Sequence, residues 1–466
     1  MQKRCITIFL IIIRKGNKVM EEKHLFKKDN NYIILNLKNM KIFKLPTKLN
    51  SLLDGMSEQE LKEVESKLTL EKDNDEQKQL TIHKENKNIC KRLILNVSNS
   101  CNLACKYCYA EEGKYATNQE LEMMNIDTLK KAIEAAYDIY SEGIEMIQFF
   151  GGEPLLNKKL LSVCIPEINS IVERRKMKKP KYTIVTNGTL IDDDYIKLFN
   201  EHFESITISL DGEKEVNDCN RCFANNNSSV YDVIMKNIKK MNEKKRNFYL
   251  AVEATITKKH IDNYKKTGRI DTFYLLRDLE LDAVQHGPLI DKKLINTSLS
   301  HADENDVIDY FEQWIKNEFS NGEDKIRCRT IANIINMYNS GQVYSNGCGA
   351  TKSDLAVDVT GNMYPCFMFI GIDKFIIGNV TDFDINKYKD RRGELAKLFM
   401  EANNNDKCNS CWIKGMCEKT YGHCIGARYL QNNDISKPID LACEISRNVL
   451  ERIIFEVCER YGSKRK

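Results

Sequence analysis

Short strand-like runs alternate with helix-like stretches between Leu93 and about Gln285, and this alternation limits the possible folds more than any other feature of the chain. β-Branched runs predict strands at residues 93–97, 146–150, 182–186, 205–210 and 250–257. Between them, apolar residues recur three and four positions apart, as at Leu129, Ile133 and Ala136, which predicts helices with one buried face. Repeated strand–helix units build an α/β fold with a parallel sheet or barrel, whose active site lies at the carboxyl ends of the strands.

The rest of the 466-residue chain is expected to form further domains, because a single domain is usually shorter. Three short strands are predicted at residues 24–26, 32–37 and 41–45, and the spacing of Ser57 and Glu60 predicts a capping box that opens a helix. We expect an N-terminal extension at 1–20, a small α+β module with a charged linker at 21–88, the strand–helix body at 89–300, a helical bridge at 301–345, and a cysteine-rich segment with little helical period at 346–466.

The N-terminal extension carries an apolar run from Cys5 to Ile13, too short to span a bilayer, which needs about 20 apolar residues. Arg14 and Lys15 follow directly, where a signal peptide needs small residues. We therefore expect Met20 to be the true first residue and the protein to be cytoplasmic, with no membrane partner. Lys+Arg 71 against Asp+Glu 67 leaves +4, so the overall charge does not indicate a nucleic-acid partner.

The chain has 17 cysteines, and clustered cysteines in a cytoplasmic protein more often bind metal than one another. Three of them follow the first predicted strand in the order Cys101-Asn-Leu-Ala-Cys105-Lys-Tyr-Cys108. Three thiolates in such a loop can ligate three irons of one cluster and leave the fourth iron without a protein ligand. A zinc site usually has four protein ligands, so the loop favours an iron–sulfur cluster with an open position.

This C-x3-C-x-aromatic-C loop at the end of a first strand resembles that of the radical S-adenosylmethionine (SAM) enzymes. Later segments, each after a strand, are similar to the SAM-binding motifs of that family: Phe150-Gly151-Gly152-Glu153-Pro154 to the GGEP motif, Thr186-Asn187-Gly188-Thr189 to the TNGT turn, and Ser209-Leu210-Asp211-Gly212 with Arg221 to the segment that contacts the ribose and carboxylate of SAM. The resemblance implies a partial (β/α)6 TIM-like barrel with bound SAM and a [4Fe-4S] cluster on Cys101, Cys105 and Cys108.

The same resemblance implies which residues contact SAM. The expected set is Tyr107, Gly151, Gly152, Glu153, Thr186, Asn187, Ser209, Asp211 and Arg221. Within it, Tyr107 is expected near the adenine, and the Glu153 carboxylate is expected to pair with the SAM ammonium group.

The C-terminal cysteines resemble the SPASM domain of radical SAM enzymes, which carries auxiliary iron–sulfur clusters. The ligand order of that family implies two auxiliary [4Fe-4S] clusters, one on Cys408, Cys411, Cys417 and Cys443 and one on Cys348, Cys366 and Cys424. The second set lacks its fourth ligand at the usual place before Cys348, which leaves Cys328 or a substrate thiolate as candidates. Structural zinc is the alternative, because C-x2-C with two further cysteines is also a zinc-ribbon pattern.

A radical SAM site implies an oxidoreductase that makes a 5′-deoxyadenosyl radical and removes a hydrogen atom from a substrate carbon. Residues 21–72 resemble the winged-helix-like module with which many peptide-modifying members bind a leader peptide, although a purely structural cap is the alternative. The resemblance implies a maturase of the sactipeptide or ranthipeptide type, which forms a Cys thioether crosslink in a ribosomally made Cys-rich precursor peptide. Its electron donor would be a small protein such as flavodoxin or ferredoxin.

Anaerobic sulfatase maturation, the oxidation of a cysteine or serine to formylglycine, is the main competing function. Those enzymes carry an aspartate directly after the second SPASM cysteine, whereas Phe367 follows Cys366 here, and they usually lack the N-terminal module. Two more functions compete with these: a maturase that forms carbon–carbon crosslinks, and a zinc-bearing scaffold without catalysis. Cys219 and Cys222 form a C-x-x-C pair that we expect to be neither ligands nor catalytic thiols.

Overall fold

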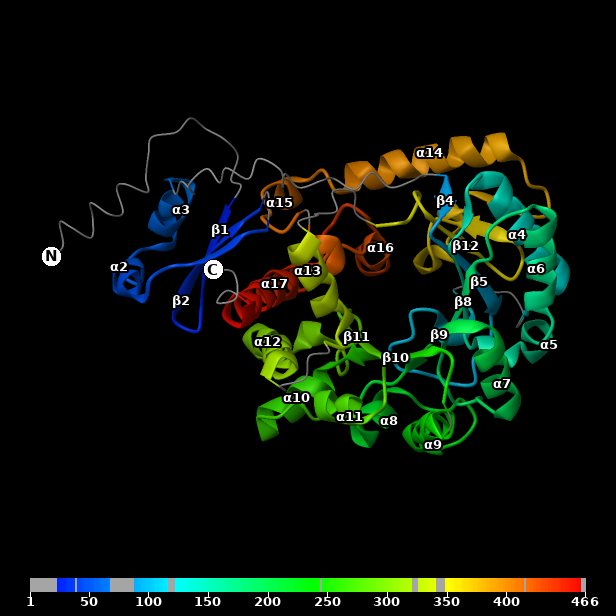
Figure 1. Ribbon diagram of the computed structural model, residues 1–466, viewed down its shortest axis with the longest axis horizontal. Helices are drawn as coiled ribbons and strands as arrows, with labels where there is room; N and C mark the ends of the chain where they lie inside the picture. The colour runs from blue at the N-terminus through cyan, green and yellow to red at the C-terminus, as the bar shows by residue number, and fades with distance from the viewer. Residues whose placement is uncertain are drawn as a thin grey trace.

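The computed structural model describes residues 23–37, 40–67, 88–115, 122–243, 245–320, 326–340, 348–414 and 416–461 of the chain. Within these ranges the centre of the protein is a nine-stranded sheet with the order β11-β10-β9-β8-β7-β5-β12-β13-β14 (Figure 1). A three-stranded sheet, β1-β2-β3, lies apart from it, and β4 (Ile89–Cys90) pairs with β6 (Gly143–Ile144). Strands joined by helices dominate the fold, which confirms the predicted α/β class.

The barrel part of the central sheet consists of parallel strands. They are β5 (Arg92–Ser98), β7 (Met146–Gly151), β8 (Lys181–Thr186), β9 (Phe203–Ser209), β10 (Tyr249–Ile256) and β11 (Ala283–Pro288). The first five coincide with the predicted strand runs, whereas the sequence pattern did not single out β11, which contains Gln, His, Gly and Pro. Because β11 and β14 lie at the two edges of the described sheet, the barrel is open.

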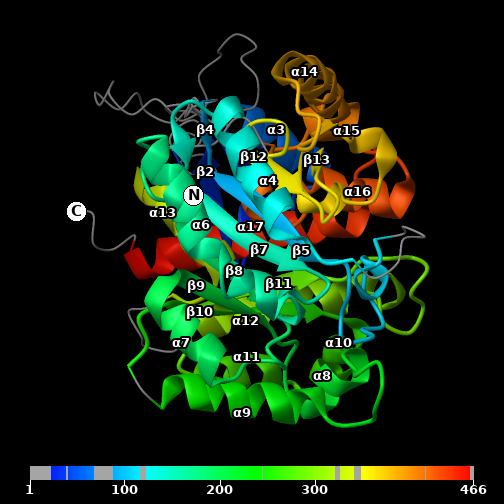
Figure 2. The same ribbon diagram turned by 90° about the vertical axis from the view of Figure 1, so that its right-hand side faces the viewer.

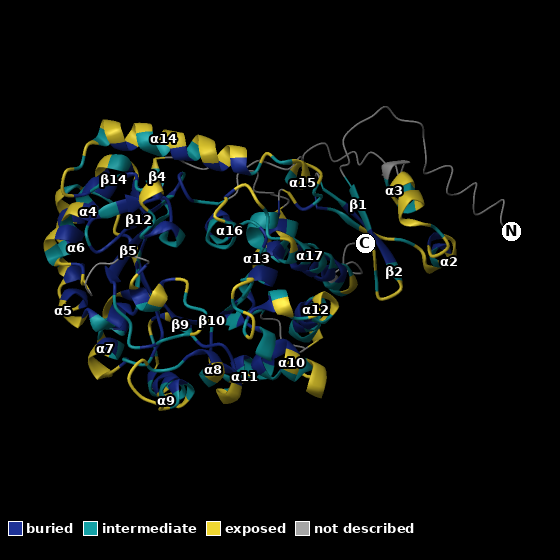
Figure 3. Ribbon diagram, turned by 180° about the vertical axis from the view of Figure 1, so that it is seen from behind, coloured by how far each residue is buried: buried dark blue, intermediate teal, exposed yellow. Residues whose placement is uncertain are grey.

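Helices surround the parallel strands (Figures 2 and 3). They are α4 (Ile126–Ile139), α5 (Lys158–Leu161), α6 (Cys164–Arg174), α7 (Asp193–His202), α8 (Lys214–Asn220), α9 (Val230–Asn242), α10 (Lys258–Thr267) and α11 (Asp271–Asp278). In α4 the predicted apolar face is buried, and the Asn125 side chain caps the first turn by accepting from the Thr128 N–H. Exposed residues lie on the outer side of these helices in Figure 3, so their apolar sides pack inward onto the sheet.

The C-terminal segment continues the same sheet. β12 (Asp354–Val357) pairs in parallel with β5, and β13 (Asn362–Tyr364) and β14 (Gly378–Asn379) follow in antiparallel pairing. The register places Asp354 beside Arg92, and their side chains form an ion pair of 2.7 Å. The cysteine-rich segment is therefore joined to the barrel through the first barrel strand.

The expectation of little helical period after Asn346 is wrong. This segment contains α14 (Ile385–Ala402), α15 (Asp406–Asn409), α16 (Ile425–Asn432) and α17 (Asp440–Tyr461). In α17, apolar residues such as Ile445, Leu450 and Ile454 are buried on several sides of the helix. A helix that is surrounded by protein shows no one-sided apolar stripe, so its period is hard to detect in the sequence. No helix in the described ranges is both long and apolar enough to span a bilayer.

The segment between barrel and C-terminal part is helical, as the sequence predicts. It contains α12 (Glu304–Ser320) and α13 (Arg329–Ser340). α12 packs along α17, and α13 contacts both α17 and β11 (Figure 1). These contacts connect the last barrel strand to the helix that carries Cys443.

The N-terminal module contains the three predicted strands and the predicted helix. Its elements are β1 (Lys23–Lys28), β2 (Asn31–Asn36), β3 (Ile42–Lys44), α2 (Asn50–Leu53) and α3 (Glu58–Lys67). The capping box is confirmed, since the Ser57 N–H donates to the Glu60 carboxylate at 2.7 Å and the Ser57 hydroxyl accepts from the Glu60 N–H at 3.4 Å. Except for Asn88, the predicted linker at 71–88 lies outside the described residues, as does the extension at 1–20.

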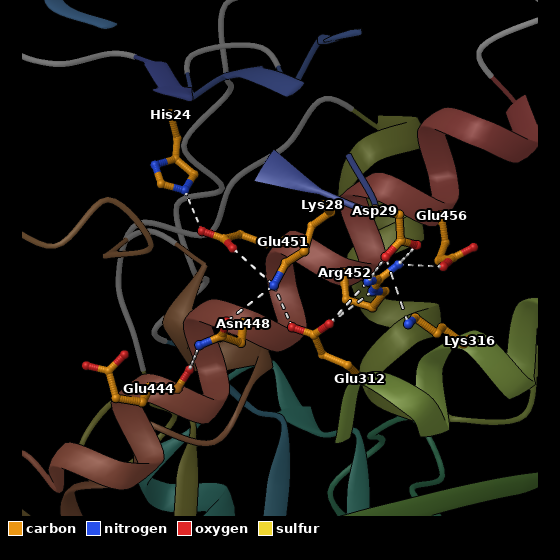
Figure 4. Close-up of polar contacts among 10 residues, drawn as sticks. All are labelled: His24, Lys28, Asp29, Glu312, Lys316, Glu444, Asn448, Glu451, Arg452 and Glu456. Carbon is orange, nitrogen blue, oxygen red and sulfur yellow. Dashed lines mark hydrogen bonds and ion pairs between the residues drawn. The ribbon is translucent and has the colours of Figure 1, made fainter. Parts of the chain in front are cut away.

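A network of charged side chains attaches this module to α12 and α17 (Figure 4). Arg452 of α17, only 2% exposed, donates to Asp29 in the turn between β1 and β2 at 2.7 Å and to Glu312 of α12 at 3.2 Å. Lys28 pairs with both Glu312 and Glu451. Because the buried guanidinium needs these carboxylates as partners, the network fixes where the module sits on the C-terminal helix.

Candidate active site

The three clustered cysteines lie in the loop that follows β5, at the carboxyl end of the first barrel strand. Backbone hydrogen bonds tie this loop to the segment after α8: the Ala104 N–H donates to Cys222 O at 2.8 Å and the Lys106 N–H to Asn220 O at 2.9 Å. The Cys222 thiol donates in turn to the Ala104 carbonyl at 3.1 Å, while Cys219 is exposed. The contact that the structure gives Cys222 is thus with the backbone of the cysteine loop.

Gly151 and Gly152, at the end of β7, pack against the same loop. A Cβ on Gly152 would lie 2.5 Å from Ser100 O and 2.8 Å from Gly113 Cα, and one on Gly151, at φ 148°, would lie 2.6 Å from Ser98 O. These distances are too short for any side chain, so the close packing of the cysteine loop by itself requires both glycines. Gly113, at φ 93°, belongs to this packing and was missed in the sequence.

Glu153 connects the end of β7 with the turn after β8. Its fully buried carboxylate accepts from the Thr186 hydroxyl at 2.6 Å, the Asn187 N–H at 2.7 Å and the Leu155 N–H at 3.0 Å. Burial raises the pKa of Glu153 to about 7, although these three hydrogen bonds oppose the shift. The structure therefore brings the predicted GGEP and TNGT residues into direct contact.

Asn187 connects that turn with the first cysteine. Its Nδ2 donates to Asn102 Oδ1 at 2.9 Å and lies 3.8 Å from Cys101 Sγ. Asn102 donates in turn to the Thr189 hydroxyl at 2.8 Å. These amide contacts fix the side of the loop on which the Cys101 sulfur lies.

Tyr107, Asp211 and Arg221 form one contact group beside the loop. The Tyr107 hydroxyl donates to Asp211 at 2.5 Å, and Arg221 Nη2 donates to the other carboxylate oxygen at 3.1 Å. The guanidinium also lies 5.5 Å from the centroid of the Tyr107 ring. Ser209 ends β9 just before this group and is half-buried. The structure thus gathers these four predicted SAM contacts at the end of β9.

One atom of this group points to a ligand. Arg221 Nε is buried and has no hydrogen-bond partner among the described residues. A buried guanidinium N–H without a partner is costly, so the position is suited to an anion such as the SAM carboxylate. The residues present therefore fit SAM.

The thiols of the loop fit an iron–sulfur cluster. Burial raises the pKa of Cys101 to about 12 and that of Cys105 to about 11, the latter against the opposing charge of Arg221. Buried thiols with such pKa values become thiolates only when a cation binds the sulfur, as the irons of a cluster do. In the described part of the chain, no group of three or more His, Cys, Asp or Glu side chains is arranged around a single metal ion.

Four of the C-terminal cysteines, Cys348, Cys366, Cys417 and Cys443, have other cysteines of their own predicted ligand set as electrostatic neighbours. Burial is the main cause that raises the pKa of Cys348, and the charge of Cys424 is the next one. For Cys366, burial again comes first and the charge of Cys348 second. These three thiols therefore lie together. Burial and then the charges of Cys443, Cys411 and Cys408 raise the pKa of Cys417 to about 12. The second group also accepts from side chains, with Asn405 Nδ2 3.3 Å from Cys408 Sγ.

Cys328, considered as a further ligand, has different neighbours. Its Sγ lies 3.4 Å from His286 Nε2, and His286 Nδ1 lies 3.0 Å from the Tyr421 hydroxyl. Burial raises the pKa of Cys328 to about 12 and lowers that of His286 to about 3, so both are neutral. None of the contacts described for Cys328 is with Cys348, Cys366 or Cys424.

Phe367 lies beside the barrel site. Its ring centroid is 4.9 Å from that of Phe150 and 6.5 Å from that of Tyr109, and the Arg92 guanidinium lies 5.9 Å away. Phe150 precedes the two motif glycines, and Tyr109 follows Cys108. We call Phe150, Tyr109 and Phe367 the aromatic wall.

Glu253 is a second feature that sequence reasoning missed. It is exposed on β10 between the buried residues Val252 and Ala254. The sequence could have indicated this residue, because a single glutamate within an otherwise apolar, β-branched strand is expected to point away from the hydrophobic core.

The family model described as Radical SAM superfamily matches residues 95–275 of this chain. The cysteine-type anaerobic sulfatase-maturating enzyme of Clostridium novyi (strain NT) is 28% identical over 344 residues, which cover 70% of this chain and 86% of that protein.

Two groups of solved structures share the fold. Native anSMEcpe with bound AdoMet superposes with a TM-score of 0.65 at 17% identity and covers 80% of this chain and 100% of its own. Streptococcus suis SuiB bound to precursor peptide SuiA superposes with a TM-score of 0.52 at 16% identity and covers 92% of this chain and 99% of its own.

Proposed function

We propose that this chain, whose residues 95–275 match the radical SAM superfamily, modifies a ribosomally made precursor peptide by forming a Cys thioether crosslink. The observation that carries the peptide substrate is the N-terminal sheet, which has an edge suited to a peptide strand. The observation that favours the thioether is Phe367, which stands where a sulfatase-maturating enzyme carries a carboxylate.

The open edge belongs to β3. β3 pairs with β2 on one side, and no strand in the described ranges pairs with its other side. The outer side of β1 is covered instead, since the Leu25 N–H donates to the Glu65 carboxylate of α3. Phe43 on β3 is 37% exposed. An extended leader peptide added to this edge would gain main-chain hydrogen bonds from β3 and a contact with Phe43.

The solved relatives support a peptide substrate. SuiB, whose structure contains its precursor peptide, matches a larger share of this chain than anSMEcpe does.

The local chemistry supports a thioether product. The second cysteine of the Cys348, Cys366 and Cys424 group is followed by Phe367, which lies in the aromatic wall. An apolar ring cannot accept a proton at this position. With three thiols in the group, an auxiliary cluster there would leave one iron without a protein ligand, and the sulfur of a peptide cysteine could approach it near the barrel site.

Formylglycine formation on a sulfatase is the second candidate, and the 28% identity to the Clostridium novyi enzyme favours it. Both candidates share their first step: Cys101, Cys105 and Cys108 would hold a [4Fe-4S] cluster which, with SAM, would supply a 5′-deoxyadenosyl radical for hydrogen abstraction.

The residues of the chain position the reactants. Arg221 would donate from its unpartnered Nε to the carboxylate of SAM, while Asp211 and Tyr107 hold the guanidinium in place. Phe150 and Phe367 of the aromatic wall would present apolar surface to the reacting carbon. A flavodoxin or ferredoxin delivers the electron that starts each turnover.

The test is an anaerobic assay of reconstituted, reduced enzyme with SAM and the Cys-rich peptide encoded beside its gene, analysed by mass spectrometry. A thioether appears as a mass loss equal to one pair of hydrogen atoms per link, with thiols that resist alkylation after dithiothreitol. A peptide aldehyde that reacts with a hydrazide would instead establish formylglycine and refute the thioether. Cys105→Ala, which removes a ligand, is expected to form no 5′-deoxyadenosine, and Cys219→Ser, at an exposed thiol, is expected to behave like the wild type.

A further inference from the structure

Glu253 lies on the face of the barrel sheet that carries the candidate active site. Alternate side chains of a strand point to opposite faces, and Val252 and Ala254 belong to the hydrophobic core. Glu253 points to the other face and is exposed. In register it lies beside Ser209 of β9 and Gln285 of β11, at the end of the strands where the SAM contacts gather.

The carboxylate of Glu253 is available for a new contact. Among the residues that the structure describes, none forms a hydrogen bond or an ion pair with it, although the buried Asp211 nearby is fully engaged with Tyr107, Arg221 and the Thr255 N–H. An unpaired carboxylate that water can reach, on the inner face of a barrel, can be reached by a substrate as well.

The charges around Glu253 come from several elements. Burial by the surrounding barrel is the main cause that raises the pKa of Glu253. Three arginines lower this pKa, in decreasing order Arg329 of α13, Arg221 after α8 and Arg92 of β5. The charge of Asp211 raises it slightly further. The side chain is therefore solvent-accessible but lies in a region of low dielectric. Its pKa is placed above that of an ordinary glutamate, which makes it a better proton acceptor.

Glu253 and the aromatic wall share neighbours. Arg92 acts on Glu253 and also lies 5.9 Å from the Phe367 ring. The ring of Tyr109 lies 6.5 Å from that of Phe367. Burial is the main cause that raises the pKa of Tyr109, followed by Tyr115 and two cysteines, and the charge of Glu253 also contributes. Arg92 is therefore a neighbour of both the Glu253 carboxylate and the Phe367 ring.

We propose that Glu253 is the catalytic base that accepts the proton of the peptide thiol during thioether formation. This step rests on the proposed function. The substrate C–H hydrogen leaves with the 5′-deoxyadenosyl radical, the thiol proton moves to Glu253, and the sulfur bonds to the carbon radical. One C–H and one S–H bond break and one C–S bond forms, and an auxiliary iron–sulfur cluster on the C-terminal cysteines would be the acceptor for the remaining electron.

The test compares Glu253→Gln, which keeps the shape and removes the base, with Glu253→Asp, which keeps a carboxylate. Glu204→Gln is the matched control, because Glu204 is an exposed glutamate near the start of β9 whose partner is Lys181. Two quantities are measured for each variant: thioether formed per 5′-deoxyadenosine, and the Kd of the precursor peptide for the protein without SAM, by fluorescence anisotropy.

We expect Glu253→Gln to form 5′-deoxyadenosine without forming the thioether efficiently. Glu253→Gln still makes 5′-deoxyadenosine, and with a deuterated peptide the label still reaches it, but thioether per 5′-deoxyadenosine falls about a hundredfold, the usual contribution of a general base. The peptide Kd stays within about threefold, because the proton transfer does not hold the peptide. In the wild type and in Glu253→Asp the thioether yield falls as the pH drops and protonates the carboxylate, whereas the yield of Glu253→Gln is low at every pH.

Three results would overturn the inference. These are an unchanged thioether yield in Glu253→Gln, a loss fully accounted for by a weaker peptide Kd, and an equal loss of thioether and 5′-deoxyadenosine. The proposed function is judged separately on the wild type: 5′-deoxyadenosine without any thioether refutes that function and this step with it. If Glu253→Gln loses iron, the pH dependence of Glu253→Asp replaces it as the test. A thioether yield of Glu253→Asp that does not fall at low pH would count against Glu253 as the base.

Discussion

The imidazole of His24 stacks on the indole of Trp412, with 3.7 Å between the ring centroids and 11° between the planes. His24 belongs to β1 of the N-terminal module, and Trp412 directly follows Cys411. The module proposed to bind the leader therefore touches the loop of a predicted auxiliary cluster, and Glu451, which pairs with His24, comes from α17, which also carries Cys443. The N-terminal module and the region of the predicted cluster therefore form one structural unit.

This contact predicts a pH dependence of stability. Burial lowers the pKa of His24, but hydrogen bonds to Glu451 and Glu65 outweigh it and raise the pKa above 6.5. A raised folded pKa stabilises the protein fully below the unfolded pKa of about 6.5, and this stabilisation is lost as the pH rises through the folded pKa. The Tm difference between wild type and His24→Gln should therefore be largest near pH 6 and shrink towards pH 8. A constant difference would contradict a protonated His24.

Arg452 should contribute strongly to the attachment of the N-terminal module. Replacing it with Ala removes the buried cation, but Asp29 is 48% exposed and Glu312 still pairs with Lys28, so the cost should lie below the about 3–5 kcal/mol of breaking a fully buried pair. Lys181→Ala breaks an exposed pair with Glu204 and should cost about 1 kcal/mol or less. Calorimetry of both variants checks this, and similar Tm shifts for the two would show that the network of Figure 4 does not stabilise the fold.

Gly152→Ala should disturb the cysteine loop before it affects any contact with SAM. The new Cβ would lie 2.5 Å from Ser100 O, and overpacking of this kind costs about 1–3 kcal/mol. We expect less iron bound after reconstitution, measured with SAM absent. Gly393→Ala in α14 is the control, because no atom lies within 4 Å of its Cβ. Full iron content in Gly152→Ala would show that the loop does not need this close packing.

Arg221→Lys should weaken SAM binding while the positive charge remains. Lysine cannot place a donor where Nε lies, and a hydrogen bond to a charged group contributes about 1.5–3 kcal/mol, which corresponds to a roughly ten- to hundredfold higher Kd. Equilibrium dialysis with labelled SAM measures the change, and Arg269→Lys, at an exposed arginine that lies over Tyr274, serves as the control. Equal Kd values for the two variants would remove Arg221 from the SAM site.

The sequence predicted the local parts of the site well. Strand runs and the spacing of Cys101, Cys105 and Cys108 are short-range patterns, and the structure has the loop directly after β5 as predicted. Each motif after a strand also reaches the expected edge, because parallel strands bring their carboxyl ends together. The sequence failed for α17, whose burial on several sides hides its period.

The sequence by itself thus determined the class of fold, the positions of the first five parallel strands and the candidate residues for a cluster and SAM, because spacing and alternation depend on neighbours a few residues away. Only the tertiary structure decided that β12 extends the sheet beside β5, that Arg452 meets Asp29, and that Glu253 shares Arg92 with Phe367. These residues are far apart along the chain, and what brings them together is the packing of whole elements, which no local pattern of side chains encodes.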